Sequence, residues 1–216
     1  FNSFKLIIKR IMRLLNELFN FILLTSSKYG IDESHDVSHS MNVLHYAQDI
    51  YEAQLYIYPP LKHYERVIYI AALLHDMCDK KYMDEIEGLN EICNYLKPRI
   101  EEKEIEMVKN IVSTMSYSKV KVNGFPKFGE YMWAYHVVRE ADLLSAYDFD
   151  RCMIYHLKQN NGDIDSSFAN ASKLFENRVF KHNDDGLLLT EYSKKNYMQY
   201  QSNAMNRIGA WKKLLR

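Results

Sequence analysis

The stretch Val67-Ile-Tyr-Ile-Ala-Ala-Leu-Leu74 is a strongly apolar run that ends directly in the dipeptide His75-Asp76. Positions 68, 71 and 72 lie seven, four and three residues before His75, so they share its face in a helix. We therefore predict a helix over residues 63–77 that places a histidine and a carboxylate at the end of a buried face. Because an unpaired buried carboxylate is costly, these two residues need a partner in the interior.

Two further polar residues interrupt apolar helix faces. His39 shares a predicted face with Val43, and Asp142 shares one with Val138. Four polar residues are thus expected to point inward, namely His39, His75, Asp76 and Asp142. Two imidazoles and two carboxylates suit a divalent ion such as Mn, Fe, Co, Ni or Zn, and they leave coordination positions open for water and substrate. Taken singly, such a histidine is more often a hydrogen-bonded core residue, and such an aspartate a cap or half of an ion pair.

The rest of the chain shows helical periodicity and no convincing alternating strand pattern. Seven glycines and four prolines are few for a β-rich fold. The sequence therefore predicts an all-α bundle with helices over residues 3–24, 36–56, 63–77, 84–96, 101–115, 130–148, 149–159, 165–181 and 190–214. Residues 25–36 and 116–129 are predicted as loops. We divide the chain into an N-terminal amphipathic helix, residues 1–24, and one helical domain, residues 25–216, which includes the C-terminal helices.

Charge and cysteine usage limit the classes of function. Lys plus Arg and Asp plus Glu number 28 each, so no overall field favours a nucleic-acid polymer as partner. Three cysteines without a CxxC pair favour a reduced, intracellular protein, and we expect a cytoplasmic location. Residues 14–24 are too short and too polar a stretch to span a bilayer. The helix over residues 3–24 is expected to pack on the body or on a second subunit in a homodimer, with binding to a membrane surface as the alternative.

Three segments in chain order resemble the H…HD…D signature of the HD-domain superfamily of metal-dependent phosphohydrolases. They are His39-Ser-Met-Asn-Val43, Ala71-Ala-Leu-Leu-His75-Asp76 and Glu140-Ala-Asp142-Leu-Leu-Ser-Ala146. The segment His35-Asp-Val-Ser-His39 is also similar to the HDxxH opening of one branch of small stand-alone HD proteins. The resemblance covers about residues 30–155 and implies an HD-domain helical bundle. It also implies one divalent metal ion, which would be held by His39, His75, Asp76 and Asp142.

The resemblance implies hydrolysis of a phosphomonoester or phosphodiester, such as that of a nucleotide, by metal-activated water. The substrate would be a small-molecule phosphoester, and the cofactor one Mn, Co, Ni, Mg, Fe or Zn ion. The chain departs from the HDxxH branch at one element. That branch has a stretch like DADRLDA around its last aspartate, whereas this chain has Leu143 and Ser145 in place of the arginine and the second aspartate. The departure keeps the metal ligand and removes local substrate contacts of the branch.

Residues beside the metal ligands receive roles from the same resemblance. Asp76 and Asp79 are the expected catalytic carboxylates, because nucleotidase-like members have a catalytic glutamate three residues after the metal-binding aspartate. Pairing of Asp79 with Lys80 or Lys81 at the helix end is the alternative. A phosphate needs cationic donors, so the expected substrate-binding residues include Lys80, Lys81 and Arg139, with Arg178 and Lys181 as more distant candidates. His35 is also expected to contact the substrate by lining the pocket, with binding of phosphate or of a second metal as alternatives.

Three other functions stay open at this point. The first is an HD-fold module that binds a nucleotide or a metal without turnover. The second is an oxygenase on the same fold, which would need two metals; the lack of further inward histidines weighs against it. The third is a helical interaction protein, for which four inward polar residues would be an uncompensated cost.

Overall fold

The computed structural model describes the backbone of residues 2–215 and the side chains of residues 13–215. Within these residues the chain contains α-helices, three short 3-10 helices and no strand, which confirms the predicted all-α bundle. The α-helices are α1 (Asn2–Tyr29), α2 (Val37–Ile57), α3 (Glu65–Leu74), α4 (Glu85–Leu96), α5 (Glu102–Thr114), α6 (Tyr117–Asn123), α7 (Met132–Ser145), α8 (Phe149–Gln159), α9 (Ile164–Asn177) and α10 (Glu191–Leu214). The 3-10 helices are η1 (Pro59–Tyr64), η2 (Gly129–Tyr131) and η3 (Val179–Lys181).

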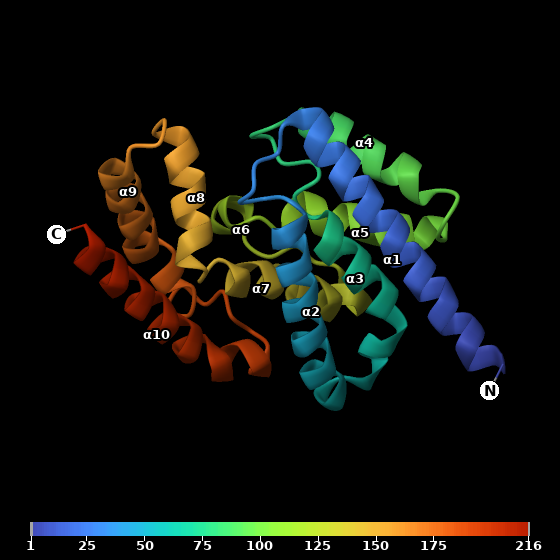
Figure 1. Ribbon diagram of the computed structural model, residues 1–216. Coiled ribbons are helices and arrows are strands. Elements are labelled where there is room, and N and C mark those ends of the chain that lie inside the picture. The colour runs from blue at the N-terminus through green and yellow to red at the C-terminus, as the bar shows by residue number, and fades with distance from the viewer. Residues whose placement is uncertain (1, 216) are drawn as a thin grey trace.

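Helices α2, α3 and α7 pack on one another at the centre of the molecule (Figure 1). Each contributes large side chains that are fully buried, among them Ile50 of α2, Ile68 of α3 and Tyr135 of α7. Helix α1 packs on α3 and α2, while α5 packs on α3 and α4. Helices α8, α9 and α10 gather at the other end, near the C-terminus (Figure 1). The polar residues that the sequence singles out lie on α2, on α7 and directly after α3.

Side-chain capping fixes where several helices begin, and among the three central helices it does so for α2. The Asp36 carboxylate accepts a hydrogen bond of 2.8 Å from the backbone N–H of Ser38, which is a typical N-cap. Helix α2 therefore starts at Val37, and His39 lies in its first turn. Further N-cap side chains begin the helices that follow, namely Asp84 for α4, Asp148 for α8, Asp163 for α9 and Thr190 for α10.

Helix α1 is longer than the sequence predicts. Periodicity predicts its end at residue 24, but the helix continues to Tyr29 through part of the predicted loop. The reason is continued burial, because Leu18, Ile22 and Thr25 line one face and are 0, 0 and 4% exposed. Leu18 and Ile22 belong to the same hydrophobic core as α2, α3 and α7. This half of α1 is thus packed into the body of the molecule.

Two other segments differ from the prediction. Helix α6 lies inside the predicted loop over residues 116–129, because Val120 finds buried partners in Leu143, Leu187 and Leu188 that are distant in sequence. Helix α3 ends at Leu74, so the dipeptide His75-Asp76 follows the last helical residue instead of lying within the helix. The contacts of Val120 with residues distant in the chain leave no periodic signal in the sequence.

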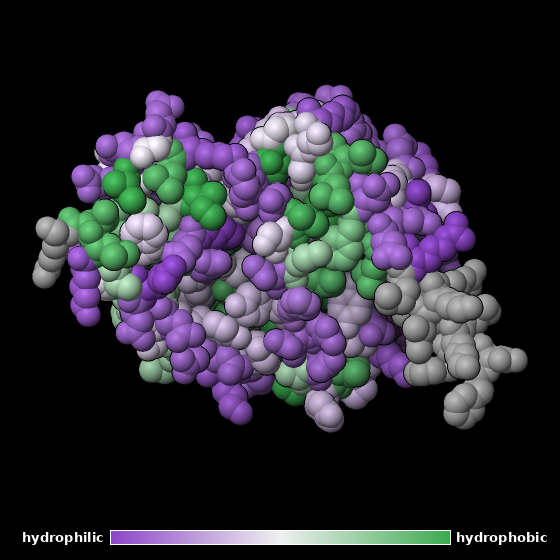
Figure 2. All heavy atoms as spheres, viewed as in Figure 1, coloured by the Kyte–Doolittle hydropathy of each residue, from purple (hydrophilic) through white to green (hydrophobic). Residues whose placement is uncertain are grey.

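Figure 2 shows the molecule in the same view as a mostly hydrophilic surface, with apolar residues gathered in separate patches over both ends. Leu23 and Leu24 of α1 are among the exposed apolar residues, at 54 and 63%. Among the helices that the structure describes, none has the length and hydropathy needed to cross a membrane.

Candidate metal centre

Four polar residues from three central elements meet at one point. His39 comes from the first turn of α2, and Asp142 comes from the last turn of α7. His75 and Asp76 follow directly after α3, where the chain leaves the helix. His39 and His75 are buried, at 2 and 7% exposure, which confirms that both histidines point inward. Packing of α2, α3 and α7 thus brings together residues that are more than one hundred positions apart in the chain.

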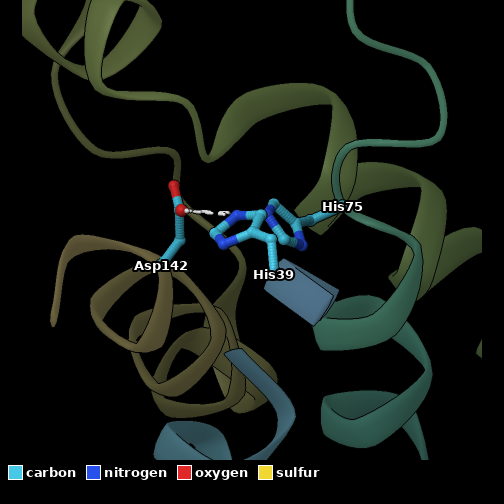
Figure 3. A group of neighbouring side chains, drawn as sticks. All are labelled: His39, His75 and Asp142. Carbon is cyan, nitrogen blue, oxygen red and sulfur yellow. Dashed lines mark hydrogen bonds and ion pairs between the residues drawn. The ribbon is translucent and has the colours of Figure 1, made fainter. Parts of the chain in front are cut away.

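The donor atoms are close enough to share one ion. The Nε2 atoms of His39 and His75 are 3.0 Å apart, and an Oδ1 of Asp142 lies 3.5 and 3.7 Å from them. Figure 3 shows the two rings and the carboxylate facing one another. Ligands at about 2.0–2.2 Å from a divalent ion lie roughly 3 Å apart when their bonds form right angles. His39, His75 and Asp142 could therefore hold a metal ion.

Asp76 provides a fourth carboxylate beside the two histidines. Its Oδ2 lies 3.2 Å from Nε2 of His39 and 3.3 Å from Nε2 of His75. This oxygen is buried and has no hydrogen-bond partner of good geometry among the described residues. A buried carboxylate oxygen without a partner is costly, and a bound cation would remove that cost. The donor set of this chain therefore fits a divalent ion.

The second ring nitrogen of each histidine also has a partner. Nδ1 of His75 lies 2.8 Å from the carbonyl oxygen of Ala72, so it carries the proton and leaves the lone pair on Nε2. Nδ1 of His39 accepts from Nη1 of Arg151 at 2.9 Å, and the same Nη1 is 3.0 Å from the carbonyl oxygen of Ser34. The proton of neutral His39 is then on Nε2. A metal held at Nε2 would need the other tautomer, with the proton on Nδ1 and Arg151 donating to the Ser34 carbonyl alone.

The field at this point is negative. Burial alone would lower the pKa of His75, but the neighbouring carboxylates of Asp76 and Asp142 raise it to about 9. Burial alone would raise the pKa of both carboxyl groups, yet the two histidines hold the pKa of each below its ordinary value. A field that stabilises a proton on His75 also attracts a divalent cation to the same place.

The four residues form the floor of a cavity of about 330 Å³. Three of the predicted substrate-binding residues line it, namely His35, Lys80 and Lys81. Asp79 lines it as well, but its Oδ1 accepts from the backbone N–H of Lys81 at 2.9 Å, and its Oδ2 is 3.2 Å from Nζ of the same lysine. The pairing weighed as the alternative for Asp79 is thus present in the structure.

Arg139 is not brought to the cavity. Its side chain is buried, at 1% exposure, and Nη2 donates to the carbonyl oxygen of Leu187 at 2.6 Å and to Oε1 of Glu140 at 3.0 Å. The guanidinium lies over the ring of Phe125, 4.9 Å from its centroid. We therefore withdraw Arg139 from the substrate-binding residues. Its three-residue spacing from Asp142 favours the same helix side, but contacts with the segment before α10 turn the long side chain away.

Sequence reasoning missed several residues that line the cavity, namely Tyr117, Lys119, Arg151 and Tyr155. It placed Arg178 among the more distant candidates, and this residue also lines the cavity. The Arg178 guanidinium stacks on Tyr117 at 4.1 Å, and its Nε has no hydrogen-bond partner among the described residues. No local pattern marks these positions, because they lie on α6, on α8 and directly after α9, and these segments reach the cavity only through tertiary packing.

Comparison of the chain with protein-family models, curated proteins and solved structures gave no match. The HD-domain resemblance therefore rests on the three sequence elements and stays a prediction. The all-α fold and the cluster of His39, His75 and Asp142 are properties of the chain itself.

Proposed function

We propose that this protein is a metal-dependent phosphohydrolase of the HD type that cleaves a phosphomonoester or phosphodiester bond, with a nucleotide as substrate. One observation carries the proposal. His39, His75, Asp76 and Asp142 converge at the floor of a cavity whose wall is rich in lysine and arginine. Metal donors beside fixed positive charge suit a substrate with phosphoryl oxygens.

A divalent ion held by these four residues would lower the pKa of a bound water and polarise a phosphoryl oxygen. Mn, Co, Ni, Mg, Fe and Zn are all candidates for that ion. In residues 13–215 this is the one group of at least three such side chains with converging donors, which favours a single metal over the two-metal oxygenase.

The cavity wall supplies the remaining contacts of the proposal. Arg178 lines the cavity, and its guanidinium can donate to a phosphoryl oxygen there. Lys80 and Lys81 offer ammonium groups at the side where the chain leaves α3. The rings of Tyr117 and Tyr155 provide aromatic faces on which a nucleobase can stack.

Phosphate release from a panel of nucleotides and generic phosphoesters tests the proposal. The protein is freed of metal, reconstituted with each of the six ions in turn, and assayed beside Asp142→Ala. The exposed Asp165→Ala on α9 is the matched control. We expect turnover that needs metal, is lost in Asp142→Ala and is retained in Asp165→Ala. Silence across the panel by protein that has bound the metal would sink the hydrolase proposal in favour of the metal- or nucleotide-binding module.

A further inference from the structure

A buried carboxylate lies behind the cavity wall, outside the metal centre. Asp32, in the segment between α1 and α2, is 6% exposed and does not line the cavity. Its Oδ1 accepts from the backbone N–H of Ser34 at 2.9 Å and from the Ser34 hydroxyl, and its Oδ2 accepts from the Tyr82 hydroxyl at 2.7 Å. Burial would raise the pKa of Asp32, but the nearby His35, whose Nδ1 is 3.6 Å from Oδ1, and hydrogen bonds from Ser34 and Tyr82 lower it below the ordinary value. The carboxylate is therefore ionised and acts as an acceptor.

His35 contacts the same two hydroxyl groups. Its Nδ1 lies 2.7 Å from Oγ of Ser34 and 3.1 Å from the phenolic oxygen of Tyr82. A hydroxyl has a single proton to donate, and both of these protons go to Asp32. The two oxygens face His35 with their lone pairs, so Nδ1 of His35 must be the nitrogen that carries hydrogen.

The contact of the other ring nitrogen independently indicates the same tautomer of His35. Nε2 of His35 is 3.1 Å from Nζ of Lys81. An ammonium group can only donate, so Nε2 must present a lone pair. Both sides of the ring therefore require one tautomer, with the proton on Nδ1 and the acceptor on Nε2.

Lys81 is held in the cavity through this nitrogen. Its ammonium also lies 3.2 Å from Oδ2 of Asp79 and 5.5 Å from the centroid of the Tyr155 ring. His35, Asp79, Lys81 and Tyr155 all line the cavity. A flexible lysine side chain loses much rotamer freedom when it is fixed, and three contacts from different elements restrict it before any ligand arrives.

We propose that Asp32, Ser34 and Tyr82 are positioning residues that fix the tautomer of His35, so that His35 holds the Lys81 ammonium ready for an oxygen of a phosphate group. The assignment of the tautomer stands on the hydrogen bonds alone, whereas the phosphate as ligand rests on the proposed function. Asp32 acts only through its neighbours. Asp32 accepts the protons of the Ser34 and Tyr82 hydroxyls, and these hydroxyls therefore present their lone pairs to His35.

Nitrogen NMR of histidine-labelled protein tests the tautomer, because protonated and unprotonated ring nitrogens give separate signals. His35→Gln identifies the resonances. We expect one tautomer of His35 in the wild-type protein, with hydrogen on Nδ1. Asp32→Asn and Tyr82→Phe release a hydroxyl proton or remove a hydroxyl, and we expect mixed tautomers in both. Tyr64→Phe is the control, since its hydroxyl lies 3.5 Å from Glu130 on the surface. Hydrogen on Nε2 in the wild type would overturn the proposal even if Asp32→Asn fails to fold.

Binding of inorganic phosphate, measured by calorimetry in Mg²⁺ buffer, tests the consequence for Lys81. We expect Lys81→Gln and Asp32→Asn to weaken phosphate binding by about 10-fold. This is the lower end of the ~10–100-fold loss that is typical when a residue that orients a ligand-binding residue is changed. Equal phosphate affinity in the wild type and both variants would overturn the role of Lys81. Absence of hydrolysis with the tautomer and the Lys81-dependent binding intact would count against the proposed function alone.

Discussion

Helix α7 carries a fully buried carboxylate on one side and a half-buried carboxylate on the other, and the two sides differ in how the charge is compensated. Glu140 is fully buried and accepts from Arg139, from the backbone N–H groups of Leu189 and Thr190, and from the Thr190 hydroxyl. Asp142, two residues later, faces the imidazoles of His39 and His75 instead. Two helical positions apart correspond to about 200° around the axis, so the carboxylates point to opposite sides.

The difference separates a structural cluster from a candidate reactive one. Hydrogen-bond donors of the protein surround Glu140. These hydrogen bonds connect the segment before α10 to α7. At the metal centre, carboxylates and imidazoles converge on each other without a lysine or arginine between them. Buried charge alone is therefore not a mark of function. The informative feature is a convergence of metal-type donors whose carboxylates have no lysine or arginine partner among the described residues.

The isosteric change Asp142→Asn should have the largest effect on function. An amide is a poor ligand for these ions, and we expect hydrolysis to fall by more than the ~10–100-fold loss typical of outer-shell changes. Metal content, measured after dialysis, should also fall. The free energy of unfolding of the metal-free protein should differ from that of the wild type by no more than about 1 kcal/mol, because the Asp142 carboxylate accepts no strong hydrogen bond from the protein that the amide would lose. Full metal content in this variant would contradict the ligand assignment.

Glu140→Gln should show the reverse pattern. Removing the charged partner of Arg139 leaves a guanidinium buried in the core, which typically costs about 3–5 kcal/mol. Urea denaturation measures this loss, and the folded fraction should bind metal with wild-type affinity. A Glu140→Gln protein of unchanged stability that loses its metal would show that the two sides of α7 are not independent.

Gly88→Ala tests whether the scaffold around the metal centre tolerates any growth. A Cβ at this position would lie 2.8 Å from Cα and Cβ of Cys78 and from Sδ of Met83, in the segment that follows Asp76. Overpacking of this kind costs about 1–3 kcal/mol, and we expect a lower unfolding midpoint. Gly209→Ala is the control, because nothing lies within 4 Å of its added Cβ. Alanine in that helix should stabilise the protein by up to about 1 kcal/mol.

Arg178→Gln distinguishes the role of the half-buried Arg178 from that of the buried Arg139. Arg178 lines the cavity and Arg139 does not, so we expect the KM for a phosphoester to rise by roughly 10-fold, as for the loss of one charge-assisted hydrogen bond. The free energy of unfolding of the Arg178→Gln variant should change little. Lys173, on helix α9 just before Arg178, is exposed, and Lys173→Gln should leave KM unchanged. A KM that is unaffected by Arg178→Gln would remove this arginine from the proposed substrate contacts.

The smallest expected effect is the pH dependence of metal affinity. The neighbouring carboxylates raise the pKa of His75 to about 9, above its ordinary value, so below that pH a metal ion must displace a proton. Affinity should therefore rise with pH, by at most about tenfold per unit, and level off near pH 9. Calorimetry in buffers of different ionisation enthalpy counts the released proton. Glu140→Gln should keep the wild-type slope, and a pH-independent affinity would contradict the assignment of His75.

Several features of the site can be predicted from the sequence because they depend on neighbours along the chain. Spacing of three and four residues predicts which side of a helix is buried, and this places His39 and His75 inward. The N-cap at Asp36 is equally local. The HD-type resemblance adds Asp76 and Asp142 as common ligands, and the structure brings the donor atoms of all four close together.

Local rules do not predict which helices meet, and the errors follow from that. Arg139 has suitable spacing from Asp142, yet the Leu187 carbonyl and Glu140 determine its direction. Arg151 of α8 and Arg178, which directly follows α9, line the cavity only in the folded molecule, where α8 and α9 pack on each other.

The sequence alone thus determined the helical fold class and the inward direction of the metal-type residues. Only the tertiary structure decided the cavity wall and the partner of each buried charge. The physical reason is that periodicity encodes interactions within one helix, whereas hydrogen bonds such as Asp32–Tyr82 and His39–Arg151 join residues far apart in the chain.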